Sequence, residues 1–282
     1  MIRIILHGRT GNILFQYALG RVLSEKHGVP LALDASWYNE EGWGEVSHFL
    51  KLPIKAKVVR PCAPLSLVSR ALRKWRGKHQ WEYLYGNFLK ERADDHTFDT
   101  RFLKAPANCV LSGYFQTPLY FTENASALRD ELHHLLAGAI QPVQEVIAML
   151  LDPRSVAVHV RRGDFLDNPV FQVCDLRYYL TSMEEMRTRV PGARFFIFSD
   201  DPGWCRSEFT GSDVHVVHTE TEARNPLHDL RLMSVASHHI IANSSYSWWA
   251  AWLGDKPGQE VILPDRWFTK DIHAPVSEKR WK

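Results

Sequence analysis

Residues 155–165 have the sequence Ser-Val-Ala-Val-His-Val-Arg-Arg-Gly-Asp-Phe, and the fold class follows from this stretch. Its first half is rich in β-branched apolar residues, which is typical of a strand buried in a parallel sheet. The polar residues Arg161, Arg162 and Asp164 follow at once, around a glycine that permits a tight turn. We therefore expect a buried strand over 155–160 whose carboxyl end presents two guanidinium groups.

On either side of this stretch, apolar runs alternate with segments of helical periodicity. In the C-terminal half the patterns predict strands over 194–198, 213–217, 239–242 and 261–263, and helices over 176–189, 227–237 and 246–253. In the N-terminal half they predict strands over 2–6, 30–33, 56–59 and 110–114, and helices over 13–23 and 124–136. Such alternation is typical of parallel sheets with helices on both faces. The expected fold class is α/β, with two Rossmann-like domains, 1–145 and 146–282, facing across a cleft.

Composition excludes several classes of protein. The chain has 282 residues, 45% of them hydrophobic, and a formal net charge of +2, which argues against a nucleic-acid partner. The four cysteines lie far apart without a C-x-x-C pair, so we expect reduced thiols. The first apolar run is too short for a signal peptide, and no stretch approaches the roughly 18 apolar residues that cross a bilayer. We therefore expect a cytoplasmic protein.

The segment 65–81 combines an apolar stripe with a basic face. An interfacial helix on anionic lipid has this pattern, and so has a solvated surface helix packed on its own domain. Peripheral contact with the inner membrane is therefore one of two interpretations of this segment.

The two arginines after the strand over 155–160 suit phosphate binding. Guanidinium groups match phosphate oxygens in charge and geometry, and Asp164 is placed to orient one of them. The alternative is an ordinary surface pair between arginine and aspartate, which contributes under about 1 kcal/mol.

A second polar pair, Asp200 and Asp201, follows the predicted strand over 194–198. A carboxylate at this place is suited to accept hydrogen bonds from the Watson–Crick edge of guanine, or to cap the following helix. The chain contains no D-x-D sequence, so it does not support a diphosphate site built on a divalent metal ion.

A third polar group, Asn243, Ser244 and Ser245, leads from a predicted strand into a predicted helix. A helix N-terminus offers unpaired N–H groups and partial positive charge to a phosphate. Simple helix capping is the alternative for these residues, and core packing is the expectation for the tryptophans at 248, 249 and 252. The pairs His133-His134 and His238-His239 lack companions at metal-ligand spacing, so we expect them on a helix surface and at a strand edge.

The loop after the first predicted strand is rich in glycine, with Gly11 and Asn12 in the loop and Gln16 one turn further on. Glycine allows the backbone to approach a ligand closely, although such loops also merely connect a strand to a helix.

These motifs, in this order, resemble those of the bacterial α-1,2-fucosyltransferases of glycosyltransferase family 11. The resemblance is carried by the blocks at 7–18, 112–116, 159–165, 198–205, 229–234 and 241–253, of which the first is His-Gly-Arg-Thr-Gly-Asn-Ile-Leu-Phe-Gln-Tyr-Ala. The H-x-R-R-G-D block and the N-S-S-Y-S-W-W block are the most specific. This chain departs from the family at Arg9-Thr10, where relatives usually carry Gly-Leu. It also matches poorly over about residues 36–110.

The resemblance implies a GT-B-like fold and transfer of L-fucose from GDP-fucose, with inversion and without a metal or other cofactor, to the 2-hydroxyl of a galactose-terminated glycan. It implies two catalytic residues: Arg161 on the β-phosphate, and Asp164, which orients the arginine or accepts the proton of the acceptor hydroxyl. The implied donor-binding residues are Arg162 on the diphosphate, His159 and Asp200 on guanine with Asp201 nearby, Asn243, Ser244 and Ser245 at the phosphates, and Gly11, Asn12 and Gln16 near fucose. A fucosyltransferase of different linkage stays open. A non-catalytic sugar-binding module explains the aromatic content but not the clustered arginines, and a phosphotransferase needs a P-loop that the chain lacks.

Overall fold

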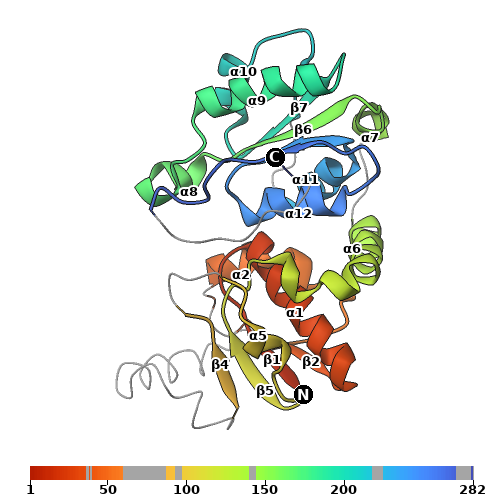
Figure 1. Cartoon of the computed structure of the whole chain (residues 1–282), viewed down its shortest axis with the longest axis vertical. Coiled ribbons are helices and arrows are strands. Elements are labelled where there is room, and N and C mark those ends of the chain that lie inside the picture. Colours follow the sequence, from red (N-terminus) through yellow and green to blue (C-terminus); the bar gives the residue numbers. More distant parts are fainter. Residues whose placement is uncertain are drawn as a thin grey trace. The chain divides into compact units, whose positions relative to one another are not determined.

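The computed structural model describes residues 1–35, 38, 40–59, 87–92, 97–139, 144–217, 225–270 and 281. These residues form two compact units, which divide in sequence at 130/131. This division lies N-terminal to the boundary of 145/146 expected from the sequence. Each unit contains a five-stranded parallel sheet, so the predicted α/β class with two parallel sheets is confirmed (Figure 1). Cys62 and the segment 65–81 lie outside the described residues.

Unit 1, residues 1–130, has the strand order β3-β2-β1-β5-β4. Its strands are β1 (Ile2–Ile5), β2 (Leu31–Asp34), β3 (Lys57–Val59), β4 (Phe88–Lys90) and β5 (Cys109–Ser112). Its helices are α1 (Thr10–His27), α2 (Glu40–Leu50), α5 (Thr100–Leu103), η1 (Pro118–Tyr120) and η2 (Thr122–Asn124), and α6 (Ala125–Ala139) crosses into unit 2. The strand at the centre is β1, so the glycine-rich loop that follows it begins in the middle of the sheet edge.

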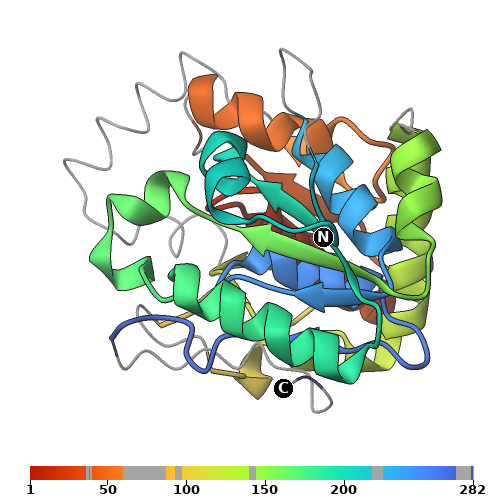
Figure 2. The same ribbon diagram turned by 90° about the horizontal axis from the view of Figure 1, so that it is seen from above.

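Unit 2 begins at residue 131 and has the strand order β10-β9-β6-β7-β8. Its strands are β6 (Ser155–Val160), β7 (Arg194–Ser199), β8 (Val214–Val216), β9 (His238–Ile240) and β10 (Val261–Ile262). Its helices are α7 (Gln144–Leu150), α8 (Gly163–Leu166), η3 (Pro169–Phe171), α9 (Leu176–Arg189), α10 (Pro202–Glu208), α11 (Pro226–Val235) and α12 (Ser245–Leu253). In Figure 2 the green and blue arrows of the neighbours β6 and β9 point the same way.

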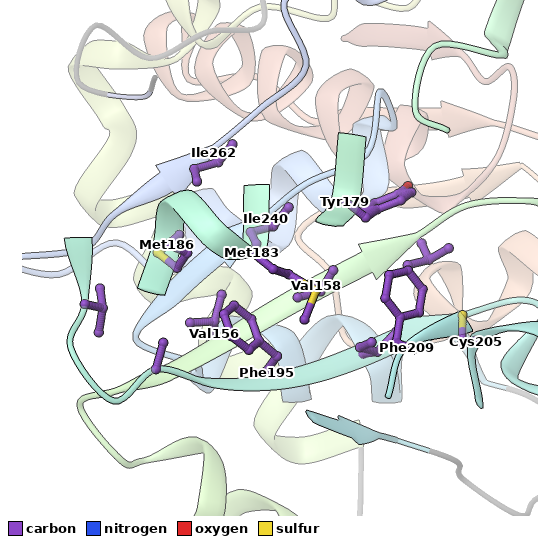
Figure 3. Close-up of a cluster of buried hydrophobic side chains, with 14 residues drawn as sticks. Val156, Val158, Tyr179, Met183, Met186, Phe195, Cys205, Phe209, Ile240 and Ile262 are labelled. Carbon is purple, nitrogen blue, oxygen red and sulfur yellow. The ribbon is translucent and has the colours of Figure 1, made fainter. Parts of the chain in front are cut away.

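The central strand β6 is buried along its whole length, as its sequence predicts. Successive side chains of a strand point to opposite faces, and Val156 and Val158 therefore lie on the same face of the sheet. There they meet side chains of α9, among them Tyr179 and Met183, in the apolar cluster shown in Figure 3. Figure 1 places α9 and α10 on this side of the sheet and α11 and α12 on the other. Apolar burial on both faces fixes the strand whose end carries the arginines.

The tryptophans of α12 belong to the core of unit 2, which confirms the structural interpretation of this motif. Trp248 and Trp249 are completely buried, and Trp252 is 2% exposed. Their rings pack edge to face or stacked, with centroids 5.1–6.1 Å apart. Trp281, near the end of the chain, packs against Trp248 at 5.6 Å. These aromatic residues hold the helix whose N-terminus follows β9.

The histidine pair His238-His239 corrects one expectation. The pair was predicted at a strand edge, but β9 lies between β10 and β6, and both residues are buried. The ring of His239 hydrogen-bonds the Met233 carbonyl oxygen at 2.9 Å and the Gln259 amide at 3.1 Å. Burial lowers the pKa of His239 from 6.5 to about 3, so the residue is neutral in the folded protein. The other pair, His133-His134, is exposed on α6 as predicted.

No helix in the described ranges is long and apolar enough to cross a membrane. Of the cysteines in these ranges, Cys109, Cys174 and Cys205 are free thiols, as expected. Burial raises the pKa of the Cys174 thiol to about 12, so this thiol stays protonated.

Protonation of His239 should make folding stability depend on pH. Between its folded pKa of about 3 and its ordinary value of 6.5, the unfolded chain binds a proton that the folded protein does not. The free energy of unfolding should therefore fall on acidification below about pH 6.5, with a slope approaching about 1.4 kcal/mol per pH unit. His238, whose pKa burial also lowers, acts in the same direction.

Urea unfolding of the wild type and of His239→Gln, measured between about pH 4 and pH 7, tests this dependence. The variant should show a smaller slope than the wild type, and the exposed His134→Gln should keep the wild-type slope. Equal slopes in His239→Gln and the wild type would contradict the assignment.

Candidate functional site

The polar residues after three neighbouring strands of unit 2 gather at one edge of its sheet. Strand β6 lies between β7 and β9, and all three run parallel. Their carboxyl ends therefore meet at the same edge, where open α/β sheets bind ligands. The residues at this edge are Arg161 and Arg162 after β6, Asp200 and Asp201 after β7, and Asn243 to Ser245 after β9. The structure thus brings together the predicted site residues of unit 2.

Arg161 is held between two carboxylates. Its Nη1 lies 2.9 Å from Asp200 Oδ2, and its Nη2 pairs with Asp164 at the first turn of α8. The side chains of Arg161 and Asp200 are each 18% exposed, whereas that of Asp164 is 44% exposed. The guanidinium also lies 5.5 Å from the ring centroid of Phe165. The cation is therefore fixed on its buried side by Asp200 and shares its outer side with a more exposed carboxylate.

Asp200 also fixes the backbone of the arginine pair, because its second oxygen accepts the Arg162 N–H at 2.9 Å. The turn passes so close to this carboxylate that a Cβ at Gly163 would lie 2.7 Å from Asp200 Oδ2. A side chain at 163 would therefore displace the Asp200 carboxylate from this position. The position of Asp200 sets both the side chain of one arginine and the main chain of the next.

Arg162 is oriented by α10. Its Nε donates to Asp201 Oδ2 at 3.1 Å, and its guanidinium lies 3.7 Å from the ring centroid of Trp204. Asp201 caps the same helix, because its Oδ1 accepts the Trp204 N–H at 3.1 Å. The hydrogen bond from the Trp204 backbone and then that from Arg162 lower the pKa of the Asp201 carboxyl. Trp204 stacks on the arginine, a function that no sequence pattern indicated.

The residues after β9 shape this edge from the other side. Asn243 is 3% exposed, and its amide donates to the carbonyl oxygens of Phe171 and Trp267. Ser244 caps α12, since its Oγ accepts the Tyr246 N–H at 3.3 Å. Ser245 begins the helix and is half-buried. Capping, one of the two interpretations of this motif, is thus present at Ser244.

His159 is the predicted residue on the strand itself. It is 7% exposed, and its ring lies 5.4 Å from the ring of Tyr246 in α12. The Tyr246 hydroxyl donates in turn to the Pro226 carbonyl oxygen. His159 therefore lies on the face of the sheet that α11 and α12 cover.

The predicted residues of unit 1 follow its own central strand. Gln16 is fully buried, and its amide joins two loops by donating to the carbonyl oxygens of His7 and Gly113, at 3.2 and 2.8 Å. It therefore holds the glycine-rich loop against the segment after β5. Asn12 accepts a hydrogen bond from Gln116 at 2.7 Å, and Gly11 is buried in the first turn of α1.

Sequence reasoning missed one residue that organises this loop region. Glu91, directly after β4, is 7% exposed and accepts two backbone N–H groups from the segment after β5. It belongs to no motif in the sequence, and its partners lie more than twenty residues away along the chain. Within the described ranges, no group of three or more histidine, cysteine or carboxylate residues is arranged to hold a metal ion.

Comparison with known proteins supports the fold and shows the family. The Bradyrhizobium fucosyltransferase NodZ has a related fold, with a TM-score of 0.50 and 14% identity over 89% of this chain and 91% of that one. The Glycosyl transferase family 11 profile matches residues 52–281, and the chain belongs to this family.

Three curated relatives are similar in sequence. An α-1,2-colitosyltransferase of Escherichia coli is 29% identical over 94% of this chain and 92% of its own length. The O-antigen biosynthesis glycosyltransferase WbnK of the same species is 23% identical over 98% of both chains. The galactoside α-(1,2)-fucosyltransferase 2 of Bos taurus is 32% identical over 41% of this chain and 36% of its own.

The two carboxylates on Arg161 should differ in their effect on stability. Asp200→Ala removes the acceptor of Arg161 Nη1 and that of the Arg162 backbone N–H, so it should lower the free energy of unfolding by about 1–3 kcal/mol. Asp164→Ala removes a more exposed partner and should cost less than about 1 kcal/mol. Urea unfolding of both variants measures the difference. A larger loss in Asp164→Ala would show that the outer carboxylate fixes the arginine.

Proposed function

We propose that this protein transfers L-fucose from GDP-fucose to the 2-hydroxyl of a galactose-terminated glycan, with inversion at fucose C1. The observation that carries the proposal is Arg161, a cation held by carboxylates at the carboxyl end of the central strand of unit 2. Membership of family 11 and similarity to a galactoside α-(1,2)-fucosyltransferase support the reaction class and the linkage.

The reaction forms one bond at C1 and breaks another. The acceptor oxygen attacks C1, the bond from C1 to the β-phosphate oxygen breaks, and its electron pair leaves with GDP. The acceptor hydroxyl gives its proton to a carboxylate, for which we propose the exposed Asp164. Negative charge therefore grows on the departing diphosphate as the sugar becomes cationic. A preorganised donor is effective at the site where such charge develops. Arg161 supplies this donor in our proposal. It exchanges the exposed Asp164 for a phosphate oxygen, while the half-buried Asp200 keeps the guanidinium in place.

The remaining residues of the edge bind the rest of the donor in this proposal. Arg162, stacked on Trp204, binds the second phosphate or orients the first. The hydroxyl groups of Ser244 and Ser245, and the backbone N–H groups at the N-terminus of α12, bind the phosphates. Asp200 and His159 are proposed at the guanine end, although both oxygens of Asp200 already accept protein hydrogen bonds.

We further propose a GT-B-like arrangement, in which unit 2 binds the donor and unit 1 the acceptor across a cleft. The similarity of fold to NodZ supports this arrangement. In it, Asn12 and Gly11 approach the sugar from the loop after β1, and buried Gln16 positions that loop.

A second donor sugar is favoured by one comparison. The α-1,2-colitosyltransferase of Escherichia coli matches this chain over nearly its whole length. Colitose is L-fucose without its 3-hydroxyl, so both sugars present the same leaving group and the same α-1,2 linkage. A site that hydrogen-bonds the 3-hydroxyl discriminates strongly against the deoxy sugar, whereas an apolar pocket discriminates weakly. Parallel reactions with GDP-fucose and GDP-colitose distinguish the two donors.

The product should form without a divalent metal ion. We expect the protein to convert GDP-fucose and lactose to GDP and an α-1,2-fucosylated product in excess EDTA, because arginine and helix N–H groups carry the charge that a metal ion would otherwise neutralise. Mass spectrometry and NMR of the product identify the linkage. Loss of activity in EDTA that added Mg²⁺ or Mn²⁺ restores would contradict metal independence, and a product of different linkage would contradict the α-1,2 assignment.

Removal of the central cation should slow the chemical step. Arg161→Ala should lower kcat by at least about 100-fold, since one preorganised donor typically contributes this much. Initial rates at saturating donor measure the effect. Arg206→Ala, which removes an exposed arginine of α10, is the matched control and should leave kcat unchanged. Wild-type turnover in Arg161→Ala would end the leaving-group assignment.

A further inference from the structure

A carboxylate in unit 1 holds a tight turn by its backbone. Glu91 follows β4, which pairs with β5, and the turn 113–115 follows β5. Glu91 Oε2 accepts the Tyr114 N–H at 2.6 Å, and Oε1 accepts the Phe115 N–H at 3.1 Å. Two successive N–H groups thus converge on one buried carboxylate. Such charge-assisted hydrogen bonds are stronger than those between neutral groups.

The conformation of this turn requires such support. Phe115 has a φ of +53°, and within the described ranges no other residue except glycine has a positive φ. An L-residue rarely adopts this left-handed conformation unless its surroundings impose it. A Cβ at Gly113 would lie 2.5 Å from the Cβ of Glu91, so only glycine fits there. The turn is therefore wrapped closely around the Glu91 side chain.

The side chain of Phe115 anchors the turn in the core. It is completely buried, and its ring centroid lies 4.9 Å from that of Phe102 and 6.0 Å from that of Tyr120. The Glu91 carboxylate fixes the backbone of the turn, and aromatic packing fixes the Phe115 side chain. Together these contacts hold the turn in one conformation.

This turn presents Tyr114 to solvent. The Tyr114 side chain is 37% exposed, although its backbone N–H is fixed by Glu91. Its ring lies edge-on to the ring of His7, at a centroid distance of 6.2 Å and an angle of 62°. His7 Nε2 is 3.0 Å from Ser112 Oγ, so the imidazole is oriented as well. Because β1 and β5 are parallel neighbours, both rings lie at the carboxyl edge of the sheet.

The pair formed by His7 and Tyr114 has the character of a sugar-binding surface. Burial and then the charge of Lys90 lower the pKa of His7, and burial and then Glu91 raise the pKa of Tyr114, so both rings are uncharged near neutral pH. One face of a pyranose ring carries C–H groups that pack on an aromatic ring, while its hydroxyls hydrogen-bond polar atoms at the ring edge. An exposed, rigid tyrosine beside a neutral imidazole offers both kinds of contact.

We propose that Glu91 is a positioning residue, which fixes the turn 113–115 so that the ring of Tyr114 packs on a sugar ring of the acceptor. The proposal rests on the proposed function, because it assigns the acceptor of that reaction to this surface. A rigid support of this kind places a binding group without an entropic cost at the moment of binding.

The first test removes the ring. With lactose as acceptor, Tyr114→Ala should raise the acceptor KM about five- to tenfold, whereas Tyr114→Phe, which keeps the ring, should stay within about twofold of the wild type. The KM for GDP-fucose and the affinity for GDP, measured by calorimetry, should not change in either variant. An unchanged acceptor KM in Tyr114→Ala overturns the assignment of this surface.

The second test loosens the support while keeping its volume. Glu91→Gln replaces one acceptor oxygen by an NH₂ group that faces a backbone N–H, so the turn loses one of its two anchors. The acceptor KM should rise about three- to fivefold, less than in Tyr114→Ala, at unchanged GDP affinity. Glu123→Gln, on the exposed surface of η2, is the matched control and should behave as the wild type. Equal losses of kcat and GDP affinity, with acceptor KM unchanged, would show a purely structural role and overturn the proposal.

The double variant Glu91→Gln/Tyr114→Ala separates positioning from other effects. If Glu91 acts through Tyr114, the acceptor KM of the double variant should equal that of Tyr114→Ala, whereas multiplied effects would show that the two residues act independently. Failure of the proposed function has a different signature, since the wild type would then transfer neither fucose nor colitose to lactose, methyl β-galactoside or N-acetyllactosamine. That result would remove the premise of this inference, whereas transfer with unaltered acceptor KM in the variants would overturn the inference alone.

Discussion

The ion pair between Arg161 and Asp200 is the interaction on which the site of unit 2 depends. It joins the ends of two neighbouring strands, and the same carboxylate also binds the backbone of Arg162. A guanidinium on a flexible stem loses considerable side-chain entropy when it becomes ordered. Because Asp200 orders it in the folded protein, this cost is met during folding rather than during binding. In the reaction that we propose, the cation is therefore already in place for the departing diphosphate.

In both units a carboxylate positions a nearby residue, but the groups that the carboxylate binds differ. In unit 2, carboxylates after β7 and in α8 hold the side chain of a cation after the central strand β6. In unit 1, the carboxylate of Glu91 holds backbone N–H groups and thereby presents an aromatic side chain. In both cases a glycine, Gly163 or Gly113, lets the backbone pass close to the carboxylate. In each unit a carboxylate thus positions a neighbouring residue at the sheet edge: Asp200 positions Arg161, and Glu91 positions Tyr114.

The sequence predicted what is encoded locally. The apolar runs that form β6 and β7 are long and buried on both faces, and the polar residues after them are adjacent in sequence to these runs. Their gathering at one edge followed from the rule that parallel strands end together. The strand β4 was not predicted, because its three residues Phe88–Lys90 show no periodicity. The position of β9 inside the sheet was also missed, since the order of strands depends on contacts distant in sequence.

Functional detail was least predictable where partners are distant along the chain. Gln16 lies one turn into a helix, and its amide joins the loops after β1 and β5, a connection that its place in the sequence does not indicate. Glu91 carries no motif, and its importance appears only when β4 and β5 are paired. Whether a polar side chain hydrogen-bonds a ligand or the protein's own backbone depends on the tertiary structure. Residue type and spacing in the sequence therefore cannot distinguish a ligand-binding side chain from a structural one.

The most direct measurement of the central claim is a crystal structure of the protein with GDP bound. The account predicts a β-phosphate oxygen within hydrogen-bond distance of Arg161, with the ion pair between Arg161 and Asp200 retained and Asp164 displaced from the guanidinium. A diphosphate bound away from the carboxyl end of β6, with Arg161 still joined to both carboxylates, would contradict it.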